Sequence, residues 1–476
     1  MATEMSGVAT LLQQQSRLGD PGAAELKSRF RGDVLRPGEA GYEAAREIWN
    51  AMIARQPAAI ARCTGTADVQ EAVRFARRHE LLVSVRGGGH NVAGNALCDG
   101  GLTIDLSLMR GIHVDSDRRT ARAQPGLRWG DYDHETEACD LASPGGIAST
   151  TGIAGFTLGG GFGYLTRLHG FASDHLISAE VVTADGERVT ASETENPDLF
   201  WGLRGGGGNF GIVTSFQFRL DPLGGVYGGQ AFYRLEHAAH VMRFCRRYLV
   251  EAPDEVFLIL NLRRALPSPL LPGALHGEKV FRLIACVFAD PERGERLLQP
   301  IRQFRTPEVD AIGPKRYTQV QSMLDAGVPP GFRDYWKSHY LADLPDEAID
   351  LSVEQARGIV ALRTQVLFSY LAPHRPGAFA DTALSHREAA WNFNINAMWE
   401  KAEEDEDHIR WAKDFFTAVE PYSTGGVYVN FLGDEGEARV RAAYDPGKYE
   451  RLVALKDRYD RNNFFRLNQN IKPSSI

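Results

Sequence analysis

The chain has 476 residues, of which 43% are hydrophobic and 24% charged, and its formal net charge is −8 at pH 7. This composition is typical of a globular enzyme with two or three lobes, and the acidic balance argues against nucleic acid or an anionic membrane as partner. No apolar stretch approaches the roughly 18 residues of a membrane helix, and no leader peptide pattern opens the chain. We therefore expect a cytoplasmic protein that acts on a small molecule, with no membrane and no nucleic acid as partner.

The first half of the chain predicts helices that alternate with strands. Residues 66–80 predict an amphipathic helix, because Val69, Val73 and Ala76 fall on one side and charged residues on the other. Buried strands are expected in LLVSVR, GLTIDLS and TARAQPG, followed by a hairpin whose tight turn is Ala184-Asp185-Gly186. This order predicts an α+β or α/β cofactor-binding domain.

After residue 222 the pattern changes to strands interleaved with amphipathic helices. YGGQAFYRL, EVFLILNLRR and VFRLIACVF are expected strands, and HVMRFCRRYL and GERLLQPIRQF are expected helices. The middle third therefore predicts an antiparallel sheet backed by helices. The five cysteines are scattered and odd in number, so neither a disulfide framework nor a metal site is expected.

A glycine turn leaves the strand LLVSVR and ends on a histidine, His90. Gly87, Gly88 and Gly89 lack the Cβ atoms that would keep a phosphate or a flat ring away from the backbone, and Arg86 adds a positive charge. Alone, such a turn is more often a flexible loop with a solvated histidine.

A second glycine run, from Gly206 to Gly211, satisfies the GxGxxG string of a dinucleotide-binding turn. That turn needs a strand before it and a helix after it. Here the helical PDLFWGLR comes first and the strand-like GIVTSFQF comes second, so we reject the Rossmann interpretation.

Six motifs in order carry a resemblance to a known family. VSVRGGGHN, LTIDLSLM, QPGLRWGDYD, GIASTTGIAGFTLGGGFGYLTRLHGFASD, LFWGLRGGGGNFGIVTSF and NNFFRLNQNIKP are similar to the berberine-bridge-enzyme-like branch of the vanillyl-alcohol-oxidase flavoproteins. The resemblance covers about Arg31 to Pro473. It implies an α+β fold in which a PCMH-type FAD-binding domain of two α/β subdomains joins the substrate domain. The implied boundaries are an N-terminal extension 1–30, an FAD-binding domain 31–222, a substrate domain 223–423 and a return to the FAD-binding domain at 424–476.

The same resemblance implies FAD as cofactor, bound covalently through His90. Family members with a second link carry a cysteine after a Pro-Gly-Gly turn, where this chain has Ala148, so one covalent link is expected. Thr151 matches the small residue found near flavin C4a in oxidases of the family. The other residues expected to contact FAD are Val85, Arg86, Gly87, Gly88, Gly89, Asn91, Pro125, Gly126, Ser149, Thr150, Gly152, Gly155, Gly159, Gly160, Gly161, Gly163, Asp174, Gly211, Ile212, Val213, Asn468 and Asn470.

Substrate chemistry is expected at Tyr428 and Asn430, because alternation along a strand would point both side chains to one face. The resemblance implies that Tyr428 is the base that removes a hydroxyl proton, which requires surroundings that lower the phenol's pKa. A packed core tyrosine is the alternative. Tyr370 and Trp399 could stack on the substrate, or belong to the core.

The implied activity is oxidation of an alcohol, a sugar or a secondary-metabolite hydroxyl by hydride transfer to flavin N5. Dioxygen would then be reduced to hydrogen peroxide. A flavin dehydrogenase, an oxidative-cyclisation enzyme and a flavin-binding protein without turnover remain as alternatives.

Overall fold

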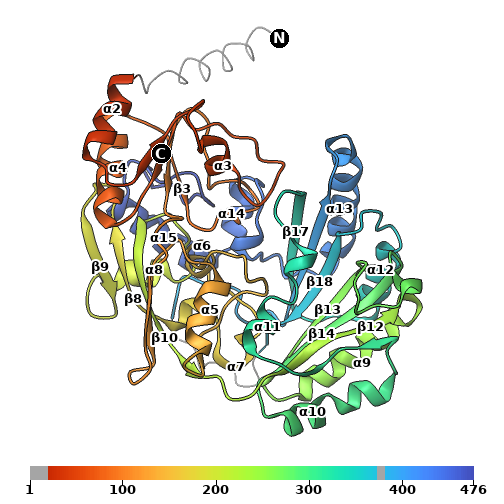
Figure 1. Ribbon diagram of the computed structural model, residues 1–476. Helices are drawn as coiled ribbons and strands as arrows, with labels where there is room; N and C mark the ends of the chain where they lie inside the picture. The colour runs from red at the N-terminus through yellow and green to blue at the C-terminus, as the bar shows by residue number, and fades with distance from the viewer. Residues whose placement is uncertain (1–19, 373–380) are drawn as a thin grey trace.

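The computed structural model describes residues 20–372 and 381–476, and its described part forms two lobes that each contain a large antiparallel sheet (Figure 1). The first lobe also holds a four-stranded sheet in the order β1-β2-β4-β3. Its strands β2, β4 and β3 run parallel. The bounds are β1 Asp33–Leu35, β2 Ala59–Arg62, β3 Val83–Arg86 and β4 Leu102–Asp105, with helices α2 Asp20–Arg29, α3 Tyr42–Arg46 and α4 Thr66–Arg78.

Helix α4 confirms the helix predicted from periodicity, and its apolar side is fully buried against the parallel strands. Helix α2 packs on the same core through Leu26, which is buried. The described end of the expected N-terminal extension is therefore part of this lobe. Residues 1–19 lie outside the described part of the chain.

The second sheet of this lobe is antiparallel, in the order β5-β6-β10-β8-β9. The β8–β9 hairpin turns at Gly186, whose φ of 77° suits glycine, as the Asp-Gly pair predicted. Its elements are β5 Ile112–Asp115, β6 Thr120–Ala123, α5 Trp129–Glu137, β7 Leu141–Ala142, α6 Ile153–Leu158, α7 Thr166–His169, η2 Ala172–His175, β8 Leu176–Val182, β9 Arg188–Ser192, α8 Pro197–Leu203, β10 Ile212–Arg219 and β11 Asp221–Pro222. Helix α8 precedes strand β10, which is the reverse of a Rossmann turn.

The second lobe is built on the predicted antiparallel sheet, ordered β15-β12-β14-β13-β18-β19-β17, with β16 beside β12. Helices α9, α10, α12 and α13 cover one face of the sheet (Figure 1). The bounds are β12 Tyr227–Arg234, α9 Ala238–Glu251, β13 Val256–Arg264, β14 Lys279–Val287, α10 Pro291–Phe304, β15 Val309–Asp310, β16 Gly313–Pro314, α11 Tyr317–Gln321, β17 Arg333–Leu341, α12 Asp346–Ala356, β18 Gln365–Tyr370, β19 Trp391–Trp399 and α13 Asp405–Val419.

The C-terminal segment packs on the first lobe, where helices α14 Glu437–Ala442 and α15 Pro446–Tyr459 join the core of the second sheet. A buried ion pair secures it: Lys456 Nζ lies 2.7 Å from Asp460 Oδ2, and both side chains are 0% exposed. The same ammonium donates to the carbonyls of Asn209 and Phe465. This ion pair and its two hydrogen bonds, called the Lys456 pin below, hold the glycine loop before β10 against the segment around Phe465.

Of the helices in residues 20–372 and 381–476, none combines the length and apolar character needed to cross a bilayer. The same residues contain no group of three or more His, Cys, Asp or Glu side chains that could hold a metal ion.

Candidate functional site

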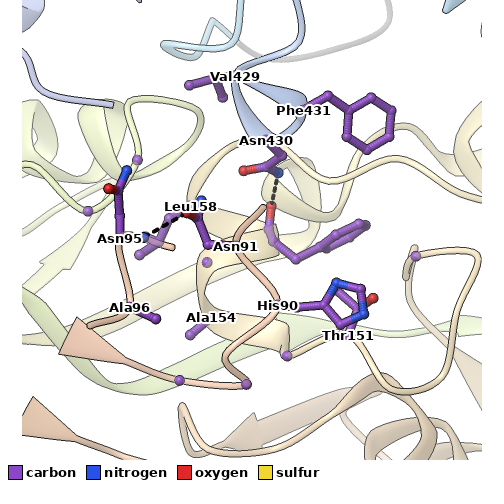
Figure 2. Close-up of a pocket in the computed structure, with 18 of the residues that line it drawn as sticks. His90, Asn91, Asn95, Ala96, Thr151, Ala154, Leu158, Val429, Asn430 and Phe431 are labelled. Carbon is purple, nitrogen blue, oxygen red and sulfur yellow. Dashed lines mark hydrogen bonds between the residues drawn. The ribbon is translucent and has the colours of Figure 1, made fainter. Parts of the chain in front are cut away.

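A cavity of about 320 Å³ lies where the two lobes meet. The parts of the chain that line it include the glycine loop after β3, residues 146–158, the strands β18 and β19, the segment Tyr428–Phe431, and residues within 207–213 and 465–469. In Figure 2 the segment that carries Asn430 lies across the pocket from the loop that carries His90. The cavity thus lies between two surfaces. One is formed by the glycine-rich loops of the first lobe, which include Gly87–Gly89, Gly152 and Gly211 and are called the glycine wall below, and the other by the sheet of the second lobe.

Bare backbone forms the glycine wall. A Cβ atom added to Gly88 would lie 2.5 Å from the Cα atom of Gly152, so the two loops cross at a distance that only glycine allows. Gly211 has a φ of +155°, and a Cβ there would lie 2.5 Å from Val181 Cγ1. Beside them, Asn468 lines the cavity, and its buried Oδ1 has no hydrogen-bond partner among the described residues. Close backbone and an unused polar atom fit a large, flat, phosphate-bearing cofactor such as FAD.

His90 follows the first glycine turn of this wall. Its ring stacks on Trp49, with 4.5 Å between ring centroids and 18° between planes. The Trp49 indole N–H donates to the Val328 carbonyl at 3.1 Å, which fixes the stack. Burial lowers the pKa of His90 to about 4, so the imidazole is neutral at pH 7 and one ring nitrogen is free to form a bond.

Tyr428 and Asn430 both line the cavity, but not on a strand. Tyr428 precedes the short 3-10 turn η8 Val429–Phe431, and Asn430 is the middle residue of that turn. The predicted strand is therefore wrong, although the two side chains do lie together. The Tyr428 hydroxyl oxygen accepts hydrogen bonds from Gly161 N and from Asn430 Nδ2, each at 2.9 Å. Burial nevertheless raises the pKa of Tyr428, and the two hydrogen bonds offset this only in part. The net direction of this pKa shift is opposite to the one that a tyrosine base requires.

Strands β18 and β19 supply a polar floor that sequence reasoning missed. Cross-strand neighbours Gln365 and Asn396, and likewise Ser369 and Asn392, line the cavity together with Asn394. Alternation along QVLFSY and WNFNINAMW is the signal that could have found them, since every second residue is polar in WNFNIN.

Other expected residues also line this cavity. They are Val85, Gly87, Gly89, Asn91, Ala148, Thr151, Gly155, Ile212 and Val213. The cavity lining does not include Arg86, Pro125, Gly126, Ser149, Thr150, Gly159, Gly160, Gly161, Gly163, Asp174, Asn470, Tyr370 or Trp399.

Local contacts explain the residues that lie outside. The guanidinium of Arg86 donates to the Ala45 carbonyl, away from the glycine turn. Asp174 pairs with Arg387, which donates to its Oδ2 at 3.0 Å, and Ser149 N donates to Asp325 Oδ1 at 2.9 Å. These side chains support the loops that form the cavity.

The remaining glycines pack behind the wall. A Cβ at Gly159 would lie 2.1 Å from Asn430 Oδ1, and one at Gly163 would lie 2.1 Å from the Gly145 carbonyl oxygen. They are required for close packing rather than for contact with the cavity.

Tyr370 and Trp399 lie on the face of the sheet that the helices cover, and not on the face that lines the cavity. Both belong to the core beneath the helices, where Tyr370 packs on Trp391 at 4.8 Å and Trp399 stacks on His408 at 5.0 Å. Successive strand residues point to opposite faces, so their neighbours Ser369 and Met398 face the other way. The expectation that these two rings flank the substrate is therefore wrong.

Comparison with protein families supports this site. A family model described as FAD binding domain matches residues 57–192, which include His90 and the glycine wall. A second, described as Berberine and berberine like, matches residues 427–472, which include Tyr428 and Asn430. The fold and the site define an FAD-linked oxidoreductase.

Whole-chain relatives identify the family. (R)-6-hydroxynicotine oxidase of Paenarthrobacter nicotinovorans is 30% identical over 470 residues, which cover 93% of this chain and 97% of the relative. An FAD-linked oxidoreductase of Dictyostelium discoideum is 29% identical over 464 residues, covering 95% and 98%. The crystal structure of 6-hydroxy-D-nicotine oxidase from Arthrobacter nicotinovorans superposes with a TM-score of 0.84 at 28% identity, covering 94% and 98%. The chain belongs to the berberine-bridge-enzyme-like family of FAD-linked oxidoreductases.

Proposed function

We propose that this protein is an FAD-dependent oxidase that holds its flavin through one covalent bond, to His90, and oxidises a carbon that bears a hydroxyl group. The observation that carries the proposal is the neutral His90 imidazole, stacked on Trp49 in a glycine-walled cavity that continues to a polar floor. Within the described chain, the cavity lining contains no cysteine, and Ala148 is part of it. This supports a single link.

When bound, FAD supplies the electron chemistry: it takes a hydride from the substrate carbon and passes two electrons to dioxygen. The substrate loses one C–H and one O–H hydrogen and becomes a carbonyl compound, and dioxygen gains both hydrogens and becomes hydrogen peroxide. The protein's own task is to place the substrate carbon about 3–3.5 Å from the accepting atom.

We assign to Tyr428 and Asn430 the task of orienting the substrate oxygen. The Tyr428 oxygen already accepts two hydrogen bonds, so its own proton is free to be donated toward the cavity. Asn430 Nδ2 also donates to the Phe156 carbonyl at 3.0 Å, which holds its amide in one orientation. A neutral phenol in a fixed position acts as a hydrogen-bond donor to the substrate.

Thr151 supports an oxidase over a dehydrogenase, because it is a small side chain that lines the cavity and leaves space for dioxygen. In a dehydrogenase with the same site, the visible absorbance of the flavin would bleach in the presence of substrate, but little peroxide would be released. Substrates to screen first are alcohols and sugars.

The decisive experiment is the visible spectrum of the purified protein before and after acid precipitation. We expect yellow colour to stay with the pellet of the wild-type protein and to move to the supernatant in His90→Ala. Covalent retention in His90→Ala would refute the linkage, and a colourless wild-type protein would refute the cofactor. Peroxide release by a hydroxyl substrate, measured with a coupled peroxidase, then tests the oxidase assignment.

A further inference from the structure

Two buried arginines stand behind the polar floor of the cavity. Arg263 on β13 is 2% exposed and Arg282 on β14 is 5% exposed. No carboxylate among the described residues pairs with either guanidinium: Arg282 donates to the side-chain oxygens of Asn261, Gln230 and Gln365, all of which are neutral. Arg263 donates to the Arg264 carbonyl and to Gln365, and its Nη2 has no hydrogen-bond partner in the described part of the chain. Two like charges are therefore buried without a balancing anion, an arrangement that costs free energy.

These arginines determine how Gln365 faces the cavity. Its Oε1 accepts from Arg282 Nη2 at 3.1 Å and from Arg263 Nη1 at 3.4 Å. Guanidinium groups only donate, so the atom that faces them must be the oxygen, and the Gln365 NH₂ is directed away from them. Because Gln365 lines the cavity, this NH₂ is a donor held in front of two positive charges.

Neighbouring amides on β19 extend the same surface. Asn396, opposite Gln365 across the strand pair, donates its NH₂ to Asp334 Oδ1 at 2.9 Å. Its Oδ1 has no hydrogen-bond partner among the residues that the structure describes. Asn392 is 1% exposed, lines the cavity, and has no partner for either amide atom in the described part of the chain. Such unused polar atoms at a cavity wall indicate a polar ligand, with donors for the two Oδ1 atoms and an acceptor for the Asn392 NH₂.

No acidic side chain lines the cavity in the part of the chain that the structure describes. Within those residues the lining contains two titratable side chains, His90 and Tyr428, and no Asp, Glu, Lys or Arg. An anionic group on the substrate would therefore meet no carboxylate there.

From these observations, and resting on the oxidase function proposed above, we infer that the substrate binds as an oxyanion, a carboxylate or an ionised phenol. Its anionic oxygen is held by the Gln365 NH₂ in front of Arg263 and Arg282. The interaction balances the two buried charges and positions the substrate over the flavin. A cationic amine would meet repulsion at the same place.

The test is calorimetric titration of the purified holoprotein at pH 9 with benzoate, 4-cyanophenol and benzamide. Benzamide has the shape of benzoate without its charge, and 4-cyanophenol is ionised at this pH. We expect at least one anion to bind at least about tenfold more tightly than benzamide, and the tighter anion identifies the class. Anions that bind no more tightly than benzamide, including no measurable binding by any probe, would overturn the inference.

Three variants separate the effect of the buried arginine charges from the effect of direct contact with Gln365. Gln365→Glu places a carboxylate against both arginines and should weaken anion binding at least about tenfold while leaving benzamide unaffected. Gln230→Glu neutralises Arg282 from outside the cavity lining and should weaken anions less, about threefold. Gln217→Glu, the same change on β10 outside the lining, is the matched control and should change nothing.

Equal anion affinity in Gln365→Glu and Gln217→Glu would contradict the inference. The flavin content of the same samples is measured from absorbance before and after dithionite. A protein that binds anions selectively but lacks flavin or releases no peroxide would refute the oxidase function and leave the oxyanion site standing.

Discussion

The burial of His90 predicts how the proposed covalent attachment of FAD responds to acid. Burial lowers the pKa of His90 to about 4. A side chain with that pKa is still about 90% neutral at pH 5, whereas a histidine with the ordinary value near 6.5 would be only about 3% neutral. Only the neutral imidazole has a free nitrogen to form the bond. Attachment at pH 5 should therefore proceed at roughly nine-tenths of its rate at pH 7.

The assay mixes flavin-free protein with FAD at each pH, stops aliquots in acid and measures the flavin that stays with the pellet. His90→Ala gives the background. A fall of about 25-fold between pH 7 and pH 5 would mean that the imidazole is solvated, and would refute its burial beside Trp49 as the cause. The same depressed pKa affects stability: the unfolded chain takes up the proton first, so the flavin-free protein should lose up to about 3 kcal/mol relative to His90→Ala as the pH falls from about 6.5 to 4.

Three substitutions test the rest of the site. Tyr428→Phe should lower kcat about tenfold and keep the shape of the pH profile, because the phenol donates a hydrogen bond; a loss above about 10² together with a missing pH limb would instead identify a base. Gly88→Ala should reduce bound flavin by more than half, since the new Cβ would lie 2.5 Å from Gly152 Cα, whereas Gly447→Ala, with nothing within 4 Å, should bind normally. Lys456→Met should destabilise the protein by about 3–5 kcal/mol, because it leaves a buried carboxylate unpaired; an unchanged melting temperature would argue against the Lys456 pin.

Local sequence was sufficient for the first lobe's elements and for the glycine wall. The helix at Thr66–Arg78 follows from apolar periodicity, and the hairpin at Gly186 from its Asp-Gly turn. The GGGH turn is also a local feature, because only glycine allows the backbone at Gly88 to meet Gly152. These features depend on interactions within a few residues, or on what a residue type lacks, and both can be read from the chain.

Tertiary structure decided which side chains reach the cavity. Trp399 and Asn396 lie on one strand, but only the packing of helices against one face of the sheet determines that the tryptophan is core and the asparagine lines the site. The direction of Arg86, the pKa of Tyr428 and the pair of uncompensated arginines likewise depend on partners distant in sequence. Sequence alone thus determined the kind of cofactor wall this protein builds. The fold determined which charges and amides face it, because burial and long-range contacts set both.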